Sequence, residues 1–303
     1  MPLLALTIIY NTTNTKFIQN VLKCSNMSKV YWKDTLLECT RQVQKQIKPL
    51  LKTLKQPQPN LGIGAGGDPI KQIDLTAENA IIRTLTEHQA SFTLISEESG
   101  VKKYGANPSK NVVTVDPIDG TTNLMRSIPF YATSIAVSTK PTLNSVHTAL
   151  VSDLFHCITY TAEKEKGAYR GNERIMPSEN SSLEEAVLGI DLNTYKIKKI
   201  APQLTSLIEK TKHIRHFGAN ALELCYVADG TIDAFIDIRG KLRTTDVAAA
   251  WLIMKEAGAI VTTLEEKPLR TKLSPKQKVA FVASGNPKIH KTILKMLEFR
   301  KGN

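Results

Sequence analysis

Cysteines and long apolar runs are both scarce in this chain. Only four of the 303 residues are cysteine, at positions 24, 39, 157 and 225, and their spacing matches neither a metal-ligand motif nor a disulfide framework. The longest apolar stretch near the C-terminal end, residues 247–254, is stopped by Lys255 and Glu256. It is far shorter than the roughly 18 to 20 residues that a membrane span requires. We therefore predict free thiols and no transmembrane helix.

The N-terminal residues carry no clear targeting signal. The apolar segment 3–9 has no basic region before it and no clear small-residue cleavage site after it, so it is a poor secretory signal and we expect a cytoplasmic protein. Residues 1–26 show no hydrophobic period, whereas a helical period begins soon after Met27. We expect residues 1–26 to be an N-terminal extension outside the fold, and we take Met27 as the candidate functional start.

Acidic residues are in the minority, 28 against 40 basic ones, which gives a formal net charge of +12. Such a balance is compatible with nucleic acid, an acidic membrane surface or anionic small molecules as partners. From Lys267 onward the basic residues lie in polar, helical-looking sequence without the interleaved aromatic residues of a single-strand binding surface. We therefore expect a solvated basic face, with neither nucleic acid nor membrane as a partner.

The periodicity of apolar residues predicts a mixture of helices and strands. Helices are expected over residues 32–54, 75–88, 201–209, 221–228 and 247–257, and strands over 92–96, 112–115, 131–139, 147–160, 187–190, 234–238 and 279–283. Because the two types alternate irregularly, we predict layered sheets and helices, an α/β (α+β) fold, rather than a doubly wound nucleotide-binding fold. The glycine-rich segment 62–67 follows prolines instead of a strand, which argues against a dinucleotide loop.

Three acidic clusters each lie at the end of an apolar element. They are Glu97 with Glu98, Asp116 with Asp119, and Asp246. Two carboxylates about 4 Å apart repel each other by roughly 4 kcal/mol at an effective dielectric constant of 20, so gathered acids need a cation between them. Oxygen ligands favour magnesium, and the clusters contain no histidine or cysteine that would favour zinc.

The segment between the two aspartates of the central cluster suits a tight turn. Pro117 restricts one backbone angle and Gly120 permits a sharp turn, so Asp116 and Asp119 can converge on one point. The amides of Gly120 and Thr121 stand where a helix can begin, and such amides bind phosphate. The alternative for each motif is purely structural: Asp-Gly as an ordinary turn and Asp246 as a helix cap.

Four motifs, in order, resemble the inositol monophosphatase family. They are GDPIKQIDLTAE at 67–78, ISEESG at 95–100, DPIDGTTN at 116–123, and DVAAA at 246–250 followed by EAG at 256–258. The likeness runs from about Met27 to the last strand, and it is strongest to the archaeal branch that hydrolyses both inositol monophosphate and fructose 1,6-bisphosphate. It implies a layered αβαβα sandwich of the sugar-phosphatase type, usually a homodimer, whose members are in many cases inhibited by lithium.

The resemblance also implies a role for individual residues. Glu97, Asp116 and the carbonyl of Ile118 would hold a first magnesium ion, and Asp116, Asp119 and Asp246 a second, with Glu97 helping to hold a weaker third; manganese would substitute. Thr121 paired with Asp74 would activate the attacking water, and the amides of Gly120 and Thr121 would hold the phosphate. The expected subdomains are residues 28–178, with most metal ligands, and 179–298, with Asp246 and the substrate wall.

The substrate wall is where the chain departs from the family pattern, because Thr245 stands where animal-type members have tryptophan. Family polyol contacts would fall near Asn220 and Asp237. Arg239 is the first of three cations just before Asp246, and we predict that it binds the second phosphate of a bisphosphate.

The function predicted from the sequence is therefore hydrolysis of a small polyol or sugar phosphate by a metal-activated water. Two alternatives stay open: a nucleotide 3′-phosphatase of the same superfamily acting on adenosine 3′,5′-bisphosphate, and a non-catalytic anion- or nucleic-acid-binding protein. The complete set of acidic residues with Thr121 argues against the second.

Overall fold

The structure, a computed structural model, describes residues 30–54, 59–193 and 197–298. The chain divides into two units, Met1–Tyr31 and Trp32–Asn303, and the second unit contains the fold. The predicted extension 1–26 and Cys24 lie outside the described residues. Cys39, Cys157 and Cys225 are free thiols, as predicted. None of the helices in the described part of the chain has the length and apolar character needed to cross a membrane.

A large mixed sheet forms the first half of this unit, with strand order β2-β1-β3-β4-β5-β6-β7-β8. Neighbouring strands are antiparallel except β1 and β3, which run parallel. The strands are β1 (Phe92–Ser96), β2 (Gly100–Tyr104), β3 (Val112–Asp119), β4 (Ala132–Ser138), β5 (Val146–Asp153), β6 (Ile158–Glu163), β7 (Ala168–Arg170) and β8 (Glu173–Arg174).

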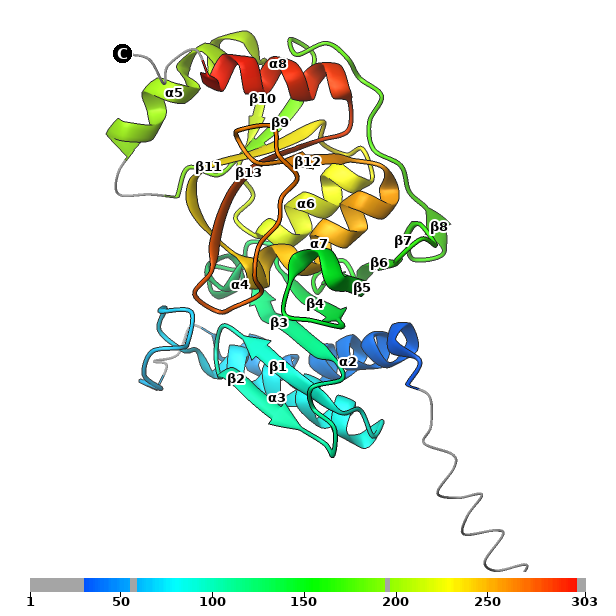
Figure 1. Ribbon diagram of the computed structural model, residues 1–303. Helices are drawn as coiled ribbons and strands as arrows, with labels where there is room; N and C mark the ends of the chain where they lie inside the picture. The colour runs from blue at the N-terminus through cyan, green and yellow to red at the C-terminus, as the bar shows by residue number, and fades with distance from the viewer. Residues whose placement is uncertain (1–29, 55–58, 194–196, 299–303) are drawn as a thin grey trace, which may run out of the picture. The chain divides into compact units, whose positions relative to one another are not determined.

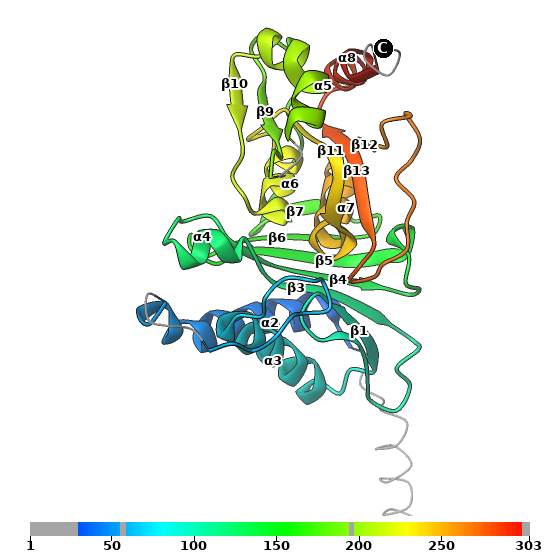
Figure 2. The ribbon, with the colours of Figure 1, turned by 90° about the vertical axis from the view of Figure 1, so that its left-hand side faces the viewer.

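Helices α2 (Trp32–Ile47) and α3 (Gln72–Glu87) pack together against one face of this sheet, as Figure 2 shows. The buried side chains of α2 include Leu36, Cys39, Val43 and Ile47, whose spacing of three and four residues places them on one side of the helix. The predicted helix was too long, because α2 ends before Pro49 and only the short 3₁₀ turn η1 (Leu50–Lys52) follows. Proline lacks the amide donor and disfavours a helical residue before it.

A smaller sheet of five strands forms the second half, in the order β10-β9-β11-β13-β12. Its strands are β9 (Val187–Ile190), β10 (His213–Arg215), β11 (Ala234–Arg243), β12 (Ile260–Thr262) and β13 (Lys278–Ser284). Helices α6 (Asn220–Ala228) and α7 (Thr244–Ala257) lie between the two sheets, and α5 (Ile197–Lys210) and α8 (Pro287–Glu298) cover the outer face of the smaller sheet (Figures 1 and 2).

The five layers are therefore helices, sheet, helices, sheet, helices, so the predicted αβαβα sandwich is confirmed. The middle layer is the most apolar: every residue of α7 from Thr244 to Met254 is buried, since a sheet lies on each side of it. The proposed subdomain boundary at 178/179 falls between β8 and β9, where the chain passes from one sheet to the other. That boundary stays a prediction.

Three element boundaries differ from the sequence prediction in ways that matter for the site. Strand β3 runs through to Asp119 instead of ending at Val115, and its pairing with β4 shifts register between Asp116 and Asp119. Helix α3 begins at Gln72 and α7 at Thr244. Polar residues in a first helical turn weaken an apolar period, which is why the pattern placed both starts three residues late.

Candidate active site

Three carboxylates from separate elements converge at one end of the large sheet. Glu97 directly follows β1, Asp116 lies within β3, and Asp246 lies in the first turn of α7. One oxygen from each lies within 4.8 Å of the others. Because β1 and β3 are parallel neighbours, with Ser96 paired to Val115, Glu97 and Asp116 emerge at the same edge of the sheet.

Asp116 and Asp119 lie on either side of the register shift and have different surroundings. Asp116 is 3% exposed, and its Oδ1 has no hydrogen-bond partner among the described residues. Asp119 Oδ2 accepts a hydrogen bond from the backbone amide of Ala221 at 2.6 Å, and the backbone amides of Asn220 and Leu222 also donate to this carboxylate. Asp119 thus caps the N-terminus of α6, a structural role that the sequence analysis did not foresee.

Burial raises the pKa of every carboxyl group in this cluster, and repulsion between the acids adds to it at Glu97, Asp116 and Asp119. The pKa of Asp119 rises to about 7, first through burial and then through the charge of Asp246. Burial and the neighbouring carboxylates also hold the pKa values of Glu97 and Asp116 well above their usual range. Buried acids of this kind, with one buried oxygen left without a partner, fit a divalent cation with oxygen ligands.

Thr121 and Asp74 meet beside this cluster. The Thr121 hydroxyl lies 3.2 Å from Asp74 Oδ1 and 2.9 Å from the carbonyl oxygen of Ile118. Asp74 comes from the first turn of α3 and is 3% exposed, and burial raises its pKa to about 7 although the hydrogen bond from Thr121 lowers it. The two residues are 47 positions apart in the chain, and the fold brings them together as the resemblance implied.

Gly120 precedes the short helix α4 (Thr121–Met125) and has a left-handed backbone with φ of 86°. A Cβ atom at this position would lie 2.8 Å from Ala219 Cβ and 3.1 Å from the carbonyl oxygen of Phe130. Glycine is therefore required here both by its conformation and by space. The amides of Gly120 and Thr121 precede the first helical hydrogen bond, so the helix does not use them.

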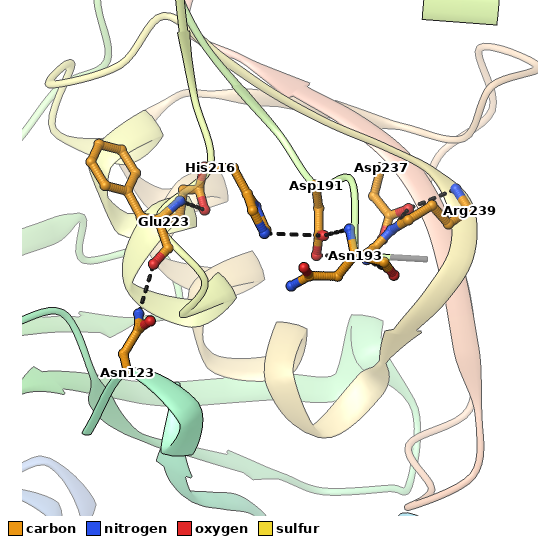
Figure 3. A network of polar contacts seen from close by, with 8 residues as sticks. Asn123, Asp191, Asn193, His216, Glu223, Asp237 and Arg239 are labelled. Carbon is orange, nitrogen blue, oxygen red and sulfur yellow. Dashed lines mark hydrogen bonds and ion pairs between the residues drawn. The ribbon is translucent and has the colours of Figure 1, made fainter. Parts of the chain in front are cut away.

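The candidate substrate residues lie in less accessible positions than expected. Asn220 begins α6, and its Oδ1 is buried without a hydrogen-bond partner among the described residues. Arg239 is 5% exposed and forms ion pairs with Asp191 and, at 2.8 Å, with Asp237 (Figure 3). Its guanidinium also donates to the carbonyl oxygen of Asn193. To bind a second phosphate it would have to give up these partners, so that role stays a prediction which the geometry disfavours.

Two features of the site had no counterpart in the sequence analysis. Arg243 Nη1 donates to Glu97 Oε2 at 2.8 Å, and its Nη2 pairs with Asp68. Thr245, which replaces the tryptophan of animal-type members, donates a hydrogen bond to Asp246 Oδ1 at 2.9 Å. The available signal for Arg243 was its place three residues before Asp246 in the basic run 239–243.

A comparison with protein-family models identifies the family. The model described as the inositol monophosphatase family matches residues 32–301. The chain belongs to the inositol monophosphatase family. This is a family of phosphatases, so the general activity predicted from the sequence is confirmed.

Individual family relatives cover most of the chain. It is 35% identical to a fructose-1,6-bisphosphatase/inositol-1-monophosphatase of Methanothermobacter thermautotrophicus, over 88% of this chain and 97% of the relative. It is 34% identical to a bifunctional NADP phosphatase/NAD kinase of Methanococcus maripaludis, over 85% of this chain but 48% of that protein. A solved structure from Pyrococcus horikoshii, with similarities to inositol-1 monophosphatase, superposes with a TM-score of 0.74 at 31% identity, covering 88% of this chain and 98% of that one.

Proposed function

We propose that this phosphatase hydrolyses phosphate monoesters of small polyols or sugars by direct attack of a water molecule activated at a magnesium site, with manganese as a substitute. The observation that carries the proposal is the convergence of Glu97, Asp116 and Asp246 beside the Thr121–Asp74 pair. A site with cation ligands alone would not need a hydroxyl and a carboxyl group placed to handle a proton next to it.

The ligand assignment follows the resemblance to the family, and the convergence of Glu97, Asp116 and Asp246 supports it. Glu97, Asp116 and the carbonyl of Ile118 would hold one magnesium ion, and Asp116, Asp119 and Asp246 another, with Glu97 also facing a weaker third. When bound, two such ions supply neutralisation of the phosphoryl oxygens, a lowered pKa for the attacking water and stabilisation of the leaving oxygen. Asp116 is common to both proposed ligand sets, and its Oδ1 is free of hydrogen bonds within the described structure.

Thr121 and Asp74 would orient the water and take its proton. When Thr121 donates its hydroxyl hydrogen to Asp74, its oxygen lone pairs are left to accept a hydrogen bond from the water. The proton can then pass through the hydroxyl to Asp74, whose pKa of about 7 suits a base near neutral pH. The amides of Gly120 and Thr121 would hold the phosphoryl oxygens, and Asn220 and Asp237 would face the polyol.

The substrate class rests on the relatives and is tested by one comparison. We expect phosphate release to be fastest, by kcat/KM, with inositol 1-phosphate or fructose 1,6-bisphosphate, and slower with adenosine 3′,5′-bisphosphate. Excess chelator should abolish all of it, and Asp116→Asn serves as the inactive control. Full turnover in chelator would refute the metal mechanism, and preference for the adenosine compound would favour the nucleotide 3′-phosphatase alternative. Absence of turnover on every substrate would favour a non-catalytic anion-binding protein.

A second candidate substrate is NADP. The observation that favours it is the 34% identity to the bifunctional NADP phosphatase/NAD kinase, of which this chain spans about half. Adding NADP to the same panel separates the two, because release of its 2′-phosphate at a kcat/KM above that of the sugar phosphates would reassign the substrate. We also propose a homodimer, which sedimentation of the full chain would test.

A further inference from the structure

Arg243 occupies a position between the metal ligands and a glycine-rich loop. Its side chain is 17% exposed, it lies at the end of β11, and its backbone amide donates to Asp246 Oδ2 at 3.2 Å. Through Nη1 it pairs with Glu97 at 2.8 Å, and through Nη2 with Asp68. One residue thus contacts two of the three converging metal ligands directly.

The loop 64–68 packs against Arg243 and Glu97. The Gly66 amide donates to the carbonyl oxygen of Glu97 at 2.6 Å, and the Ala65 amide to that of Glu98 at 3.1 Å. A Cβ atom at Gly66 would lie 3.0 Å from Arg243 Nε and 3.1 Å from Glu97 Cβ. The absence of a side chain therefore lets the loop lie directly over the Arg243–Glu97 pair.

The two partners of Arg243 differ in exposure. Glu97 is 14% exposed at its side chain, whereas Asp68 is 70% exposed. Screening by water makes the Asp68 pair the weaker one, and the pair with Glu97 the stronger. In the absence of a metal ion, the guanidinium of Arg243 therefore partly neutralises the negative charge of the acidic cluster through its ion pair with Glu97.

The guanidinium of Arg243 and a divalent ion that binds Glu97 would both interact with the same carboxylate. The ion must displace the charge-assisted hydrogen bond or share Glu97 with it, and the two positive charges repel each other in either case. Resting on the metal centre proposed above, we propose that Arg243 is a positioning residue which competes with the metal ion for Glu97 and so sets the affinity of the site. Asp68 shares the charge of Arg243 and moderates that competition.

This competition predicts opposite effects for the two partners. Arg243→Met should bind Mg²⁺ about tenfold more tightly, because both the competitor and the repulsion are removed. Asp68→Asn should bind Mg²⁺ a few-fold more weakly, because Arg243 then has Glu97 as its only ion-pair partner of these two and competes more strongly with the ion. A purely structural clamp would give weaker binding in both variants. Arg270→Met is the matched control, since Arg270 is exposed, and its affinity should equal that of the wild type.

The measurement is calorimetric titration of the full-length, metal-free protein with Mg²⁺ and Mn²⁺, together with thermal unfolding before and after saturation. Metal-free Arg243→Met should melt at a lower temperature than the wild type, and saturating Mg²⁺ should remove the difference. Equal or weaker affinity in folded Arg243→Met would overturn the inference. If that variant does not fold, Arg243→Gln takes its place, and equal or weaker affinity again overturns the inference. Unchanged or tighter binding in Asp68→Asn overturns it as well. A wild type that binds neither ion would instead refute the proposed metal centre.

Discussion

Two clusters of buried carboxylates in this protein solve the problem of burying negative charge in different ways. Around Arg239, the side chains of Asp191 and Asp237 are 2% and 0% exposed, and both pair with the guanidinium of an arginine whose side chain is 5% exposed. Around Asp116, several acids face one another, Arg243 pairs with Glu97 at the margin, and Asp116 Oδ1 has no partner among the described residues. The first cluster carries its own cation, and the second is left to receive one.

The contrast shows why the presence of buried acids alone does not mark an active site. A buried carboxylate is costly until it is paired, and Arg239 provides the pairing within the chain. In the cluster of Glu97, Asp116 and Asp246 that cost persists in the metal-free protein, because burial, and at Glu97 and Asp116 the charge of the neighbouring acids, raises the pKa values. The cluster around Arg239 is therefore compatible with a stable fold by itself. The cluster around Asp116 destabilises the metal-free protein and provides a candidate cation site.

Asp116→Asn should show the largest difference between the two clusters, because it should abolish activity without reducing stability. It removes a ligand shared by both proposed ions, so we expect kcat/KM to fall by at least about a thousandfold, or roughly 4 kcal/mol. The metal-free protein should be as stable as the wild type or more so, because like-charge repulsion is relieved. Urea unfolding in chelator measures this. Combined loss of fold and activity would show that Asp116 is structural.

Arg239→Met tests the self-neutralised cluster. It leaves two buried carboxylates without their cation, and we expect the free energy of unfolding to fall by about 3 to 5 kcal/mol. Arg243→Met is the matched comparison and should cost less, because its partners are more exposed. Urea unfolding in chelator compares the two. Equal losses would mean that the clusters do not differ as described.

The dependence of stability on pH should differ with and without a metal ion. The folded pKa values of Asp74 and Asp119 are about 7, raised from 3.8. Their contribution to stability is therefore full below about pH 4 and is lost as pH rises through 7. Metal-free protein should melt several degrees higher at pH 5 than at pH 7.5. Saturating Mg²⁺ should flatten or reverse this trend, because it binds the deprotonated groups. Equal melting temperatures without metal would contradict the predicted cost.

A substitution of Glu223 should have the smallest of these effects, and it serves as a control for the dependence of stability on pH and metal described above. It is fully buried on α6, donors from the backbone reach one of its oxygens, and burial raises its pKa to about 8. Its stabilising contribution is full below about pH 4.5 and is lost as pH rises through 8. Glu223→Gln should reduce the loss of stability between pH 6 and pH 9 by about 2 to 3 kcal/mol, with or without Mg²⁺. Thermal or urea unfolding at both pH values measures it. Dependence of this difference on Mg²⁺ would place Glu223 in the metal cluster.

The layered fold and the converging acids were open to prediction from the sequence for a physical reason. Glu97 and Asp116 follow short apolar runs, and such runs become buried parallel strands whose ends meet at one edge. Asp246 stands beside a long apolar stretch that becomes the buried helix α7. The cap that Asp119 provides for α6 was not predictable, because the two lie about a hundred residues apart and no local pattern links them.

The basic run 239–243 marks the division between local and tertiary information. By itself the sequence determined that several cations precede Asp246, and hence that positive charge lies near the acidic cluster. Only the tertiary structure decided which cation does what. Strand β11 brings Arg239 to Asp191 and Arg243 to Glu97, partners that are 48 and 146 residues distant in the chain. Charge acts over a few ångströms of space, and distance along the chain does not reveal which opposite charge will lie within them.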